Sequence, residues 1–252
     1  MIAIDLSGKT VLVTGATSEL GRVMVRTLAK AGANVAVHYH NNRVQAEQLA
    51  AECMASGVKA LIVQADITSK VEVESMRDTV AQALGAPDII VTNAVIQYKW
   101  TSVLEQAEAD YESQFRSSVM QNVLMAKAFV PAMKAKGWGR VIGINTECTM
   151  QCCPSQSAYI SGKAGMDRVL RVLAREVGEH GITVNQVAPG WTVSENRPAE
   201  GTPAAYLDKV ALKRRGSAQE IANAVAFLAS DLASFITGVY LPVCGGGVMP
   251  GI

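Results

Sequence analysis

Apolar residues follow two patterns that alternate from one end of the chain to the other. Short, nearly continuous apolar runs are typical of strands that are buried on both faces of a sheet. Longer stretches between them repeat apolar residues every three or four positions, as an amphipathic helix does. We expect strands at residues 10–13, 34–39, 59–64, 88–92, 140–145, 182–187 and 239–243, and helices at 20–31, 43–55, 70–84, 111–136, 155–179 and 217–230.

This alternation predicts parallel strands joined by crossover helices. No long polar linker, internal repeat or low-complexity segment interrupts it. We therefore expect a single α/β domain over residues 1–252, a doubly wound parallel sheet in a three-layer α/β/α arrangement. Ligands of such sheets bind outside the carboxyl ends of the strands. One crevice should therefore be lined by the loops after Val13, Tyr39, Gln64, Thr92, Asn145 and Val187.

Composition narrows the range of partners. The 252 residues are 49% apolar and 18% charged, with a net charge of +1. A near-neutral chain lacks the basic footprint of a protein that binds nucleic acid or an anionic membrane. No apolar run approaches the roughly 18 residues that span a bilayer, and the N-terminus lacks the pattern of a secretory signal. We expect a cytoplasmic protein with no nucleic-acid or membrane partner.

Five cysteines at irregular spacing argue against a disulfide framework. Cys148, Cys152 and Cys153 are clustered, but no histidine is near them and no second cysteine pair has zinc-type spacing. We expect no metal site, and thiols that are reduced and mostly buried.

Two residues four apart, Tyr159 and Lys163, stand in a stretch with a helical pattern. Positions i and i+4 share a helix face, with Cβ atoms about 5–6 Å apart. A nearby ammonium favours the phenolate and lowers the tyrosine pKa. Such a tyrosine can exchange a proton with a carbonyl or alcohol oxygen. The alternative is an ordinary surface pair on one helix face.

A glycine-containing turn, residues 14–21, follows the first expected strand and opens the first expected helix. Gly15 and Gly21 would let the backbone approach a pyrophosphate, whose negative charge the helix N-terminus favours. A tight turn without any ligand explains two glycines equally well.

The turn, residues 92–94, the pair at 159 and 163, Asn185, and Pro189-Gly190 occur in this order, with further matches at 236–238 and 245–246. Together they resemble the short-chain dehydrogenase/reductase family, in its single-domain form and similar to 3-oxoacyl-(acyl carrier protein) reductases. The resemblance covers essentially the whole chain. It implies a Rossmann-like fold and a nicotinamide cofactor. The implied reaction is hydride transfer between this cofactor and a carbonyl or alcohol substrate.

The resemblance implies a role for each catalytic position. Tyr159 matches the acid/base tyrosine, and Lys163 matches the lysine that holds the nicotinamide ribose and lowers the tyrosine pKa. Thr146 stands at the position of the catalytic serine. Ser118 stands where the family has an asparagine that supports a water-mediated proton relay, and Asn122 lies one turn later.

The resemblance also implies the cofactor contacts. Asp66 matches an aspartate that binds the adenine amino group, although a loop acid before a helix is an alternative. Residues 38–43 contain no carboxylate, and Arg43 could pair with a 2′-phosphate, which favours NADP(H) over NAD(H). Arg43 as an ordinary solvated charge remains open. The full set is Gly15, Thr17, Ser18, Leu20, Gly21, Tyr39, Arg43, Asp66, Ile67, Asn93, Ala94, Tyr159, Lys163, Pro189, Gly190, Thr192 and Ser194.

Besides Thr146, four positions depart from the family pattern. Glu19 and Val95 replace glycines, Ser118 replaces the relay asparagine, and Ser194 replaces a threonine that the family has after Pro189-Gly190. An alternative function is therefore a catalytically weakened cofactor-binding or interaction protein. A third hypothesis, loss of the cofactor and non-redox chemistry such as dehalogenation, conflicts with the retained Lys163.

The expected substrate pocket has a lid at about residues 190–215, which includes Trp191, Glu195, Arg197 and Tyr206. Trp100 and residues 148–153 would add further walls. This mixed lining identifies no substrate, and relatives act on 3-oxoacyl thioesters, sugars or small ketones. The family also implies a homotetramer or homodimer built on the long helices and the last strand.

Overall fold

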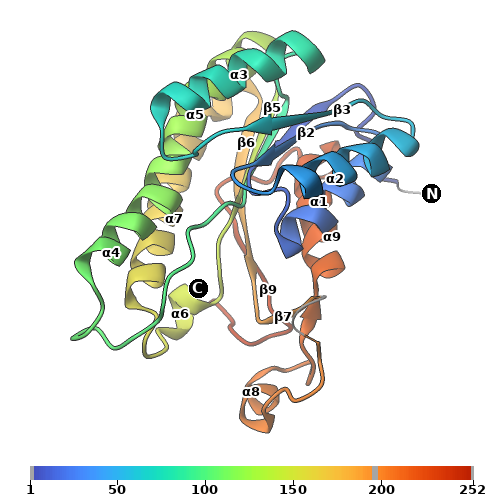
Figure 1. Ribbon diagram of the computed structural model, residues 1–252. Helices are drawn as coiled ribbons and strands as arrows, with labels where there is room; N and C mark the ends of the chain where they lie inside the picture. The colour runs from blue at the N-terminus through green and yellow to red at the C-terminus, as the bar shows by residue number, and fades with distance from the viewer. Residues whose placement is uncertain (1–2, 195–197, 251–252) are drawn as a thin grey trace.

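Seven parallel strands form one sheet in the computed structural model, which describes residues 3–194 and 198–250. The strand order is β3-β2-β1-β4-β5-β6-β9, so the direction of winding reverses between β1 and β4. Figure 1 shows the sheet between two layers of helices. The strands are β1 (Thr10–Val13), β2 (Asn34–Tyr39), β3 (Ala60–Gln64), β4 (Ile89–Thr92), β5 (Gly139–Ile144), β6 (Ile182–Pro189) and β9 (Tyr240–Val243).

The two helix layers each have their own hydrophobic core. One face of the sheet packs against α1 (Glu19–Lys30), α2 (Arg43–Ala55) and α9 (Ala218–Ala229). The other face packs against α3 (Lys70–Leu84), α5 (Gln121–Lys136) and α7 (Ser157–Val177). The predicted Rossmann-like, three-layer fold is therefore confirmed.

The apolar strand pattern produces this layering because successive side chains of a strand point to opposite faces. In β1, Val11 and Val13 belong to the core under α1, whereas Leu12 belongs to the core under α5. All three side chains are fully buried. A strand that is covered on both faces has no polar side, which explains the continuous apolar runs.

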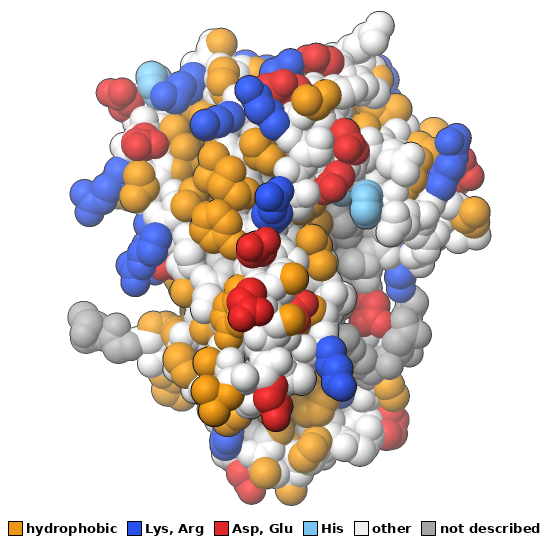
Figure 2. Space-filling model, turned by 60° about the vertical axis from the view of Figure 1, so that its left-hand side comes forward, with side chains coloured by type: hydrophobic (Ala, Val, Ile, Leu, Met, Phe, Trp, Pro, Cys, Tyr) orange, Lys and Arg blue, Asp and Glu red, His pale blue; other side chains and the backbone are white. Residues whose placement is uncertain are grey.

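The expected helix over residues 111–136 is present as one continuous helical stretch, but it begins three residues earlier and contains a π-helical turn. Its parts are α4 (Glu108–Gln114), the π-helical turn (Phe115–Met120) and α5. A π-helical turn adds a residue to the ladder and often occurs at functional sites. The helices α4, α5 and α7 form the face that is turned toward the viewer in Figure 2, where hydrophobic side chains lie among charged ones.

Several short elements near the carboxyl ends of the strands were not predicted. They are α6 (Cys148–Gln151), α8 (Ala204–Lys209) and a separate two-stranded sheet of β7 (Thr192–Val193) and β8 (Gly216–Ser217). Each is too short to show a hydrophobic period. All five cysteines are free, and Cys152 is exposed rather than buried.

The described part of the chain has no helix that is both long and apolar enough to cross a bilayer. Among the same residues, no group of three or more histidine, cysteine or acidic side chains could hold a metal ion.

Candidate active site

Three side chains predicted to be catalytic meet at the carboxyl end of β5. Tyr159 and Lys163 come from the first turns of α7, and Thr146 follows β5. The Thr146 hydroxyl lies close enough to the Tyr159 phenol to lower the phenol's pKa. The Lys163 Nζ lies 5.9 Å from the centroid of the Tyr159 ring. It donates a hydrogen bond to the carbonyl oxygen of Ile144 at 2.6 Å. Two hydroxyl groups and one ammonium therefore share one site.

Burial controls the ionisation of this group. It raises the pKa of Tyr159, and the nearby Thr146 hydroxyl opposes this only in part. The sequence predicted the opposite direction, from the charge of Lys163. That side chain is 3% exposed, and burial lowers its own pKa to about 8. Tyr159 is thus an un-ionised phenol at neutral pH, which makes it a proton donor in this structure.

Asn145 connects the end of β5 to α7 and fixes the position of Thr146. Its side-chain amide donates to the Lys163 carbonyl oxygen at 3.0 Å, and its Oδ1 accepts the Thr146 amide hydrogen at 2.9 Å. The Tyr240 hydroxyl donates to the same Oδ1 at 3.1 Å and also to the Thr146 carbonyl oxygen. No sequence pattern points to Asn145 or Tyr240, because their partners are distant in the chain.

Ser118 lies in the π-helical turn and is 1% exposed. Its hydroxyl oxygen has no hydrogen-bond partner among the described residues. Asn122, the possible substitute, is occupied elsewhere: it donates to the Ser118 carbonyl oxygen at 2.7 Å and accepts from the Thr92 hydroxyl at 2.7 Å. Of the two candidates for the relay position, only Ser118 has a polar group available.

The glycine turn is held by buried polar groups. The His38 ring accepts the Gly15 amide hydrogen at Nδ1 (2.9 Å), so its Nε2 carries the proton and lies 2.9 Å from the Ala65 carbonyl oxygen. Burial lowers the pKa of His38 to about 4, which keeps the ring neutral. The Asn93 amide donates to the carbonyl oxygens of Thr14 and Gly15, both at 3.0 Å. The loops after β1, β2 and β4 therefore form one unit.

This turn fits the backbone approach that a dinucleotide requires. Gly15 has φ +60, in the left-handed region, and a Cβ on Gly21 would lie 2.3 Å from the Gly15 carbonyl oxygen. Ser18 caps α1 by accepting the Gly21 amide hydrogen at 3.1 Å. Only glycines allow this close packing, and it brings the N-terminus of a 12-residue helix to the crevice.

Glu19, which replaces a glycine of the family pattern, is the first residue of α1. Its carboxylate accepts a hydrogen bond from the Ser194 hydroxyl. This contact links the glycine turn after β1 to the segment after β6. It also holds a negative charge beside the turn.

The side chains expected at the adenosine end lie after β2 and β3. Arg43 begins α2, is 69% exposed and pairs with Glu47 at 2.8 Å. Burial alone would raise the pKa of Asp66, but two hydrogen bonds from Thr68 lower it. Tyr39 and Ile67 are buried.

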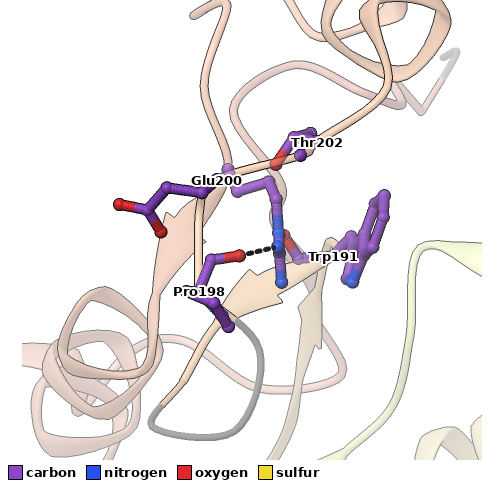
Figure 3. Close-up of a pocket in the computed structure, with 6 residues that line it drawn as sticks. Trp191, Pro198, Glu200 and Thr202 are labelled. Carbon is purple, nitrogen blue, oxygen red and sulfur yellow. Dashed lines mark hydrogen bonds between the residues drawn. The ribbon is translucent and has the colours of Figure 1, made fainter.

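Trp100 and Tyr98 add aromatic walls near Tyr159. The Trp100 ring stacks on the Tyr159 ring with centroids 5.8 Å apart, and the Tyr98 hydroxyl accepts the Tyr159 amide hydrogen at 2.8 Å. A separate hollow of about 400 Å³ in the segment after β6 is lined by Trp191, Pro198, Glu200, Gly201, Thr202 and Arg215. None of the predicted catalytic residues lines it. Figure 3 shows Trp191 and Pro198 on two sides of it, with the Glu200 carboxylate turned away. The predicted lid residues Glu195 and Arg197 lie outside the described residues.

Sequence comparison decides the family. Residues 15–247 match the family model described as enoyl-(acyl carrier protein) reductase. The chain is 35% identical over 243 residues to the 3-oxoacyl-[acyl-carrier-protein] reductase FabG of Staphylococcus epidermidis, which covers 96% of this chain and 99% of the relative. The protein belongs to the short-chain dehydrogenase/reductase family.

Further relatives support the assignment to the short-chain dehydrogenase/reductase family. The enzyme of the same name from Pseudomonas aeruginosa is 34% identical over 248 residues, which is 98% of this chain and all of the relative. A solved double mutant of the Serratia marcescens short-chain dehydrogenase/reductase superposes with a TM-score of 0.89 at 29% identity, covering 96% and 98% of the two chains. A xylitol dehydrogenase solved with NAD⁺ gives 0.88 at 26% identity, covering 95% and 99%.

The chain is thus an NAD(P)-dependent oxidoreductase that transfers a hydride between a nicotinamide cofactor and a carbonyl or alcohol substrate. The short-chain dehydrogenase/reductase fold brings the predicted site residues to neighbouring loops. Those after β1 are Gly15, Thr17, Ser18, Leu20 and Gly21, and those after β2 to β6 are Arg43, Asp66, Ile67, Asn93, Ala94, Gly190, Thr192 and Ser194, while Tyr39 and Pro189 end their strands.

Proposed function

We propose that the protein is an NADP(H)-dependent carbonyl reductase and alcohol dehydrogenase in which Tyr159 exchanges the proton. The observation that carries the proposal is that the phenol of Tyr159, the hydroxyl of Thr146 and the buried Lys163 meet on a crevice formed by the carboxyl ends of parallel strands. In reduction, the carbonyl oxygen accepts a hydrogen bond from Thr146 and the proton from Tyr159. In oxidation, Tyr159 must first lose its own proton to solvent, and the phenolate oxygen then receives the alcohol proton.

Lys163 and Ser118 support this proton transfer. The buried ammonium of Lys163 stabilises negative charge as it develops on the phenol oxygen. The unpaired hydroxyl of Ser118 is a site for a water that returns the proton from solvent. Ser118 can therefore take the place of the family's asparagine and still allow a water to carry the proton from solvent.

The bound nicotinamide would supply or accept the hydride. The glycine turn and the N-terminus of α1 would hold its pyrophosphate, Asp66 the adenine, and residues 189–194 the nicotinamide amide. The absence of a carboxylate in residues 38–43 and the exposed position of Arg43 support NADP(H). Glu47 competes with a 2′-phosphate for the same guanidinium, so the preference should be moderate.

The identity of the relatives supports 3-oxoacyl thioesters as the first substrate class to test. The partly exposed aromatic rings of Trp100 and Trp191 provide apolar surface for an acyl chain. NADPH oxidation should be followed with a 3-oxoacyl thioester series and, in parallel, with simple ketones and keto sugars of equal concentration. A kcat/KM that rises with acyl chain length supports the thioester class. Equal or higher values for short ketones would reject it.

The same experiment with NADH tests cofactor choice. We expect Arg43→Ala to raise the KM for NADPH about tenfold and to leave that for NADH unchanged, since one charge-assisted contact is lost. Arg77→Ala, a second exposed arginine with an ion-pair partner, is the matched control. An equal change with both cofactors would place Arg43 outside the site.

We also propose a single domain over residues 1–252 with a lid at 190–215, a cytoplasmic location and a homotetrameric or homodimeric assembly. Free thiols support a reducing compartment. The α4–α7 face in Figure 2 supports assembly, because Phe115 and Val172 are both more than half exposed there. Phe115→Glu should reduce the mass measured by light scattering, whereas Val44→Glu, at an exposed position of α2 on the other face of the sheet, should not.

A further inference from the structure

A buried carboxyl group lies next to the proposed active site and has no part in the proton transfer. Glu147 directly follows Thr146 and is 2% exposed. Among the described residues, no lysine, arginine or histidine forms an ion pair with it. A buried carboxylate without a cation is strongly unfavourable, so this group needs an explanation.

Two glycines leave room for the carboxyl group. A Cβ on Gly190, after β6, would lie 3.3 Å from its Oε1. A Cβ on Gly247, after β9, would lie 2.6 Å from its Oε2. The Glu147 amide also donates to the carbonyl oxygen of Pro189 at 3.0 Å. The side chain therefore fills a space at which the loops after β5, β6 and β9, three neighbouring strands of the sheet, come together.

The groups around the carboxyl are hydrogen-bonding but not cationic. Burial raises the pKa of Glu147, and the nearby Cys244, Trp191 and Gln151 groups oppose this only in part. The Oε2 atom of Glu147 has no hydrogen-bond partner among the described residues, and the Cys244 thiol donates to the carbonyl oxygen of Val248 at 3.6 Å. The titratable neighbours are Cys148, Cys244 and Tyr206, and burial raises the pKa of Tyr206 and of Cys148. All of these groups are neutral when protonated. The surroundings thus favour a neutral carboxylic acid, whose O–H can donate and whose carbonyl can accept.

We propose that Glu147 is a positioning residue whose neutral carboxyl group joins the loops after β5, β6 and β9. It thereby fixes the Thr146 hydroxyl relative to the Gly190–Trp191 backbone. The inference rests on the proposed function, since it assumes that Thr146 faces the substrate and that Gly190 and Trp191 face the nicotinamide. Ionisation of the carboxyl leaves a charge without a counter-ion, which weakens the junction and loosens both loops.

Three variants separate the proposal from a merely structural role. Glu147→Gln keeps the shape, the donor and the acceptor but cannot ionise. Glu147→Leu keeps the volume and removes both hydrogen-bonding functions. Glu105→Gln makes the same chemical change at an exposed glutamate and serves as the matched control. The full-length protein is used throughout, with NADPH as the probe of the crevice and the best carbonyl from the substrate panel.

Infrared spectroscopy tests the protonation state without any substrate. The carbonyl band of a protonated carboxylic acid should be present at neutral pH in the wild type and in Glu105→Gln, and absent in Glu147→Gln. The pH dependence of the protein's stability provides a second test. Because the folded pKa is raised, the stability from Glu147 is full below the reference pKa of about 4.3 and falls as pH rises through the folded pKa. The melting temperature of Glu147→Gln should therefore rise relative to that of the wild type as pH increases through this range.

Kinetics tests the positioning role. Glu147→Gln should keep kcat within twofold of the wild type and extend activity to higher pH, while Glu147→Leu should lose about tenfold in kcat, as expected for a lost buried hydrogen bond. A band unchanged in Glu147→Gln, identical pH profiles for it and the wild type, or full activity in Glu147→Leu would overturn the proposal. Failure of the proposed function has a different signature: the wild type neither binds NADPH nor reduces any carbonyl, whatever the infrared band shows.

Discussion

The indole ring of Trp100 lies stacked on the phenol ring of Tyr159, with ring centroids 5.8 Å apart and planes inclined by 25°. Trp100 comes from the loop after β4 and Tyr159 from α7, so the stack joins two walls of the crevice. Lys163 lies 5.9 Å from the centroid of the same phenol ring. The ring of the proposed acid/base residue is therefore positioned by an aromatic contact as well as by its own helix.

Removal of the stacking contact should reduce kcat/KM for the carbonyl substrate more than it reduces the affinity for NADPH. Trp100→Ala should lower kcat/KM for the carbonyl substrate about fivefold, because an aromatic pair contributes about 0.5–1.5 kcal/mol. Trp100→Phe should restore most of the loss. NADPH affinity, measured by nicotinamide fluorescence, should change less than twofold in both variants. A larger loss of NADPH affinity than of kcat/KM would place Trp100 at the cofactor instead.

Acid should loosen the glycine turn through His38. The folded pKa of His38 is about 4, against 6.5 for the free side chain. The unfolded chain binds the proton first, so stability is lost as pH falls from 6.5 toward 4. His38→Gln should melt at a temperature that falls less over this range. His40→Gln, an exposed neighbour, should follow the wild type. Parallel curves for the wild type and His38→Gln would contradict a buried neutral ring.

The negative charge of Glu19 should weaken cofactor binding. The hydrogen bond between Glu19 and Ser194 should strengthen it, because it links the two loops beside the cofactor. Glu19→Gln keeps a hydrogen-bonding group for Ser194 and removes the charge, so NADPH should bind several-fold more tightly at low salt. Ser194→Ala removes the link and should weaken binding. Isothermal titration of NADPH checks both. Unchanged affinity in Glu19→Gln would mean that the carboxylate points away from the pyrophosphate.

The sequence predicted the sheet and the flanking helices well, because strands such as β1 are apolar throughout and helices such as α7 keep a clear period. It could not predict the π-helical turn at Phe115–Met120, since one added residue hardly changes the apolar pattern. The position of Ser118 in that turn depends on this detail. The direction of the Tyr159 pKa was also missed, because burial outweighs a lysine whose ammonium is bound to the Ile144 carbonyl oxygen.

Glu147 carried no signal in the sequence. A glutamate beside a threonine is usually a solvated charge, and only the folded chain brings Gly190 and Gly247 against its carboxyl group. Asn145 and Tyr240 were missed for the same reason. Residues that act through contacts between distant strands are recognisable only once the strand order is known.

Tyr159→Phe tests the proposed proton transfer most directly. The variant lacks only the phenol hydroxyl, and the ring can keep its stack on Trp100. NADPH affinity by fluorescence and carbonyl reduction by NADPH absorbance should be measured on the same preparation, beside Tyr111→Phe, whose hydroxyl contacts Ser157, as a control. We expect turnover to fall at least a thousandfold, with NADPH affinity within twofold of the wild type. Turnover close to that of the wild type would remove Tyr159 from the reaction.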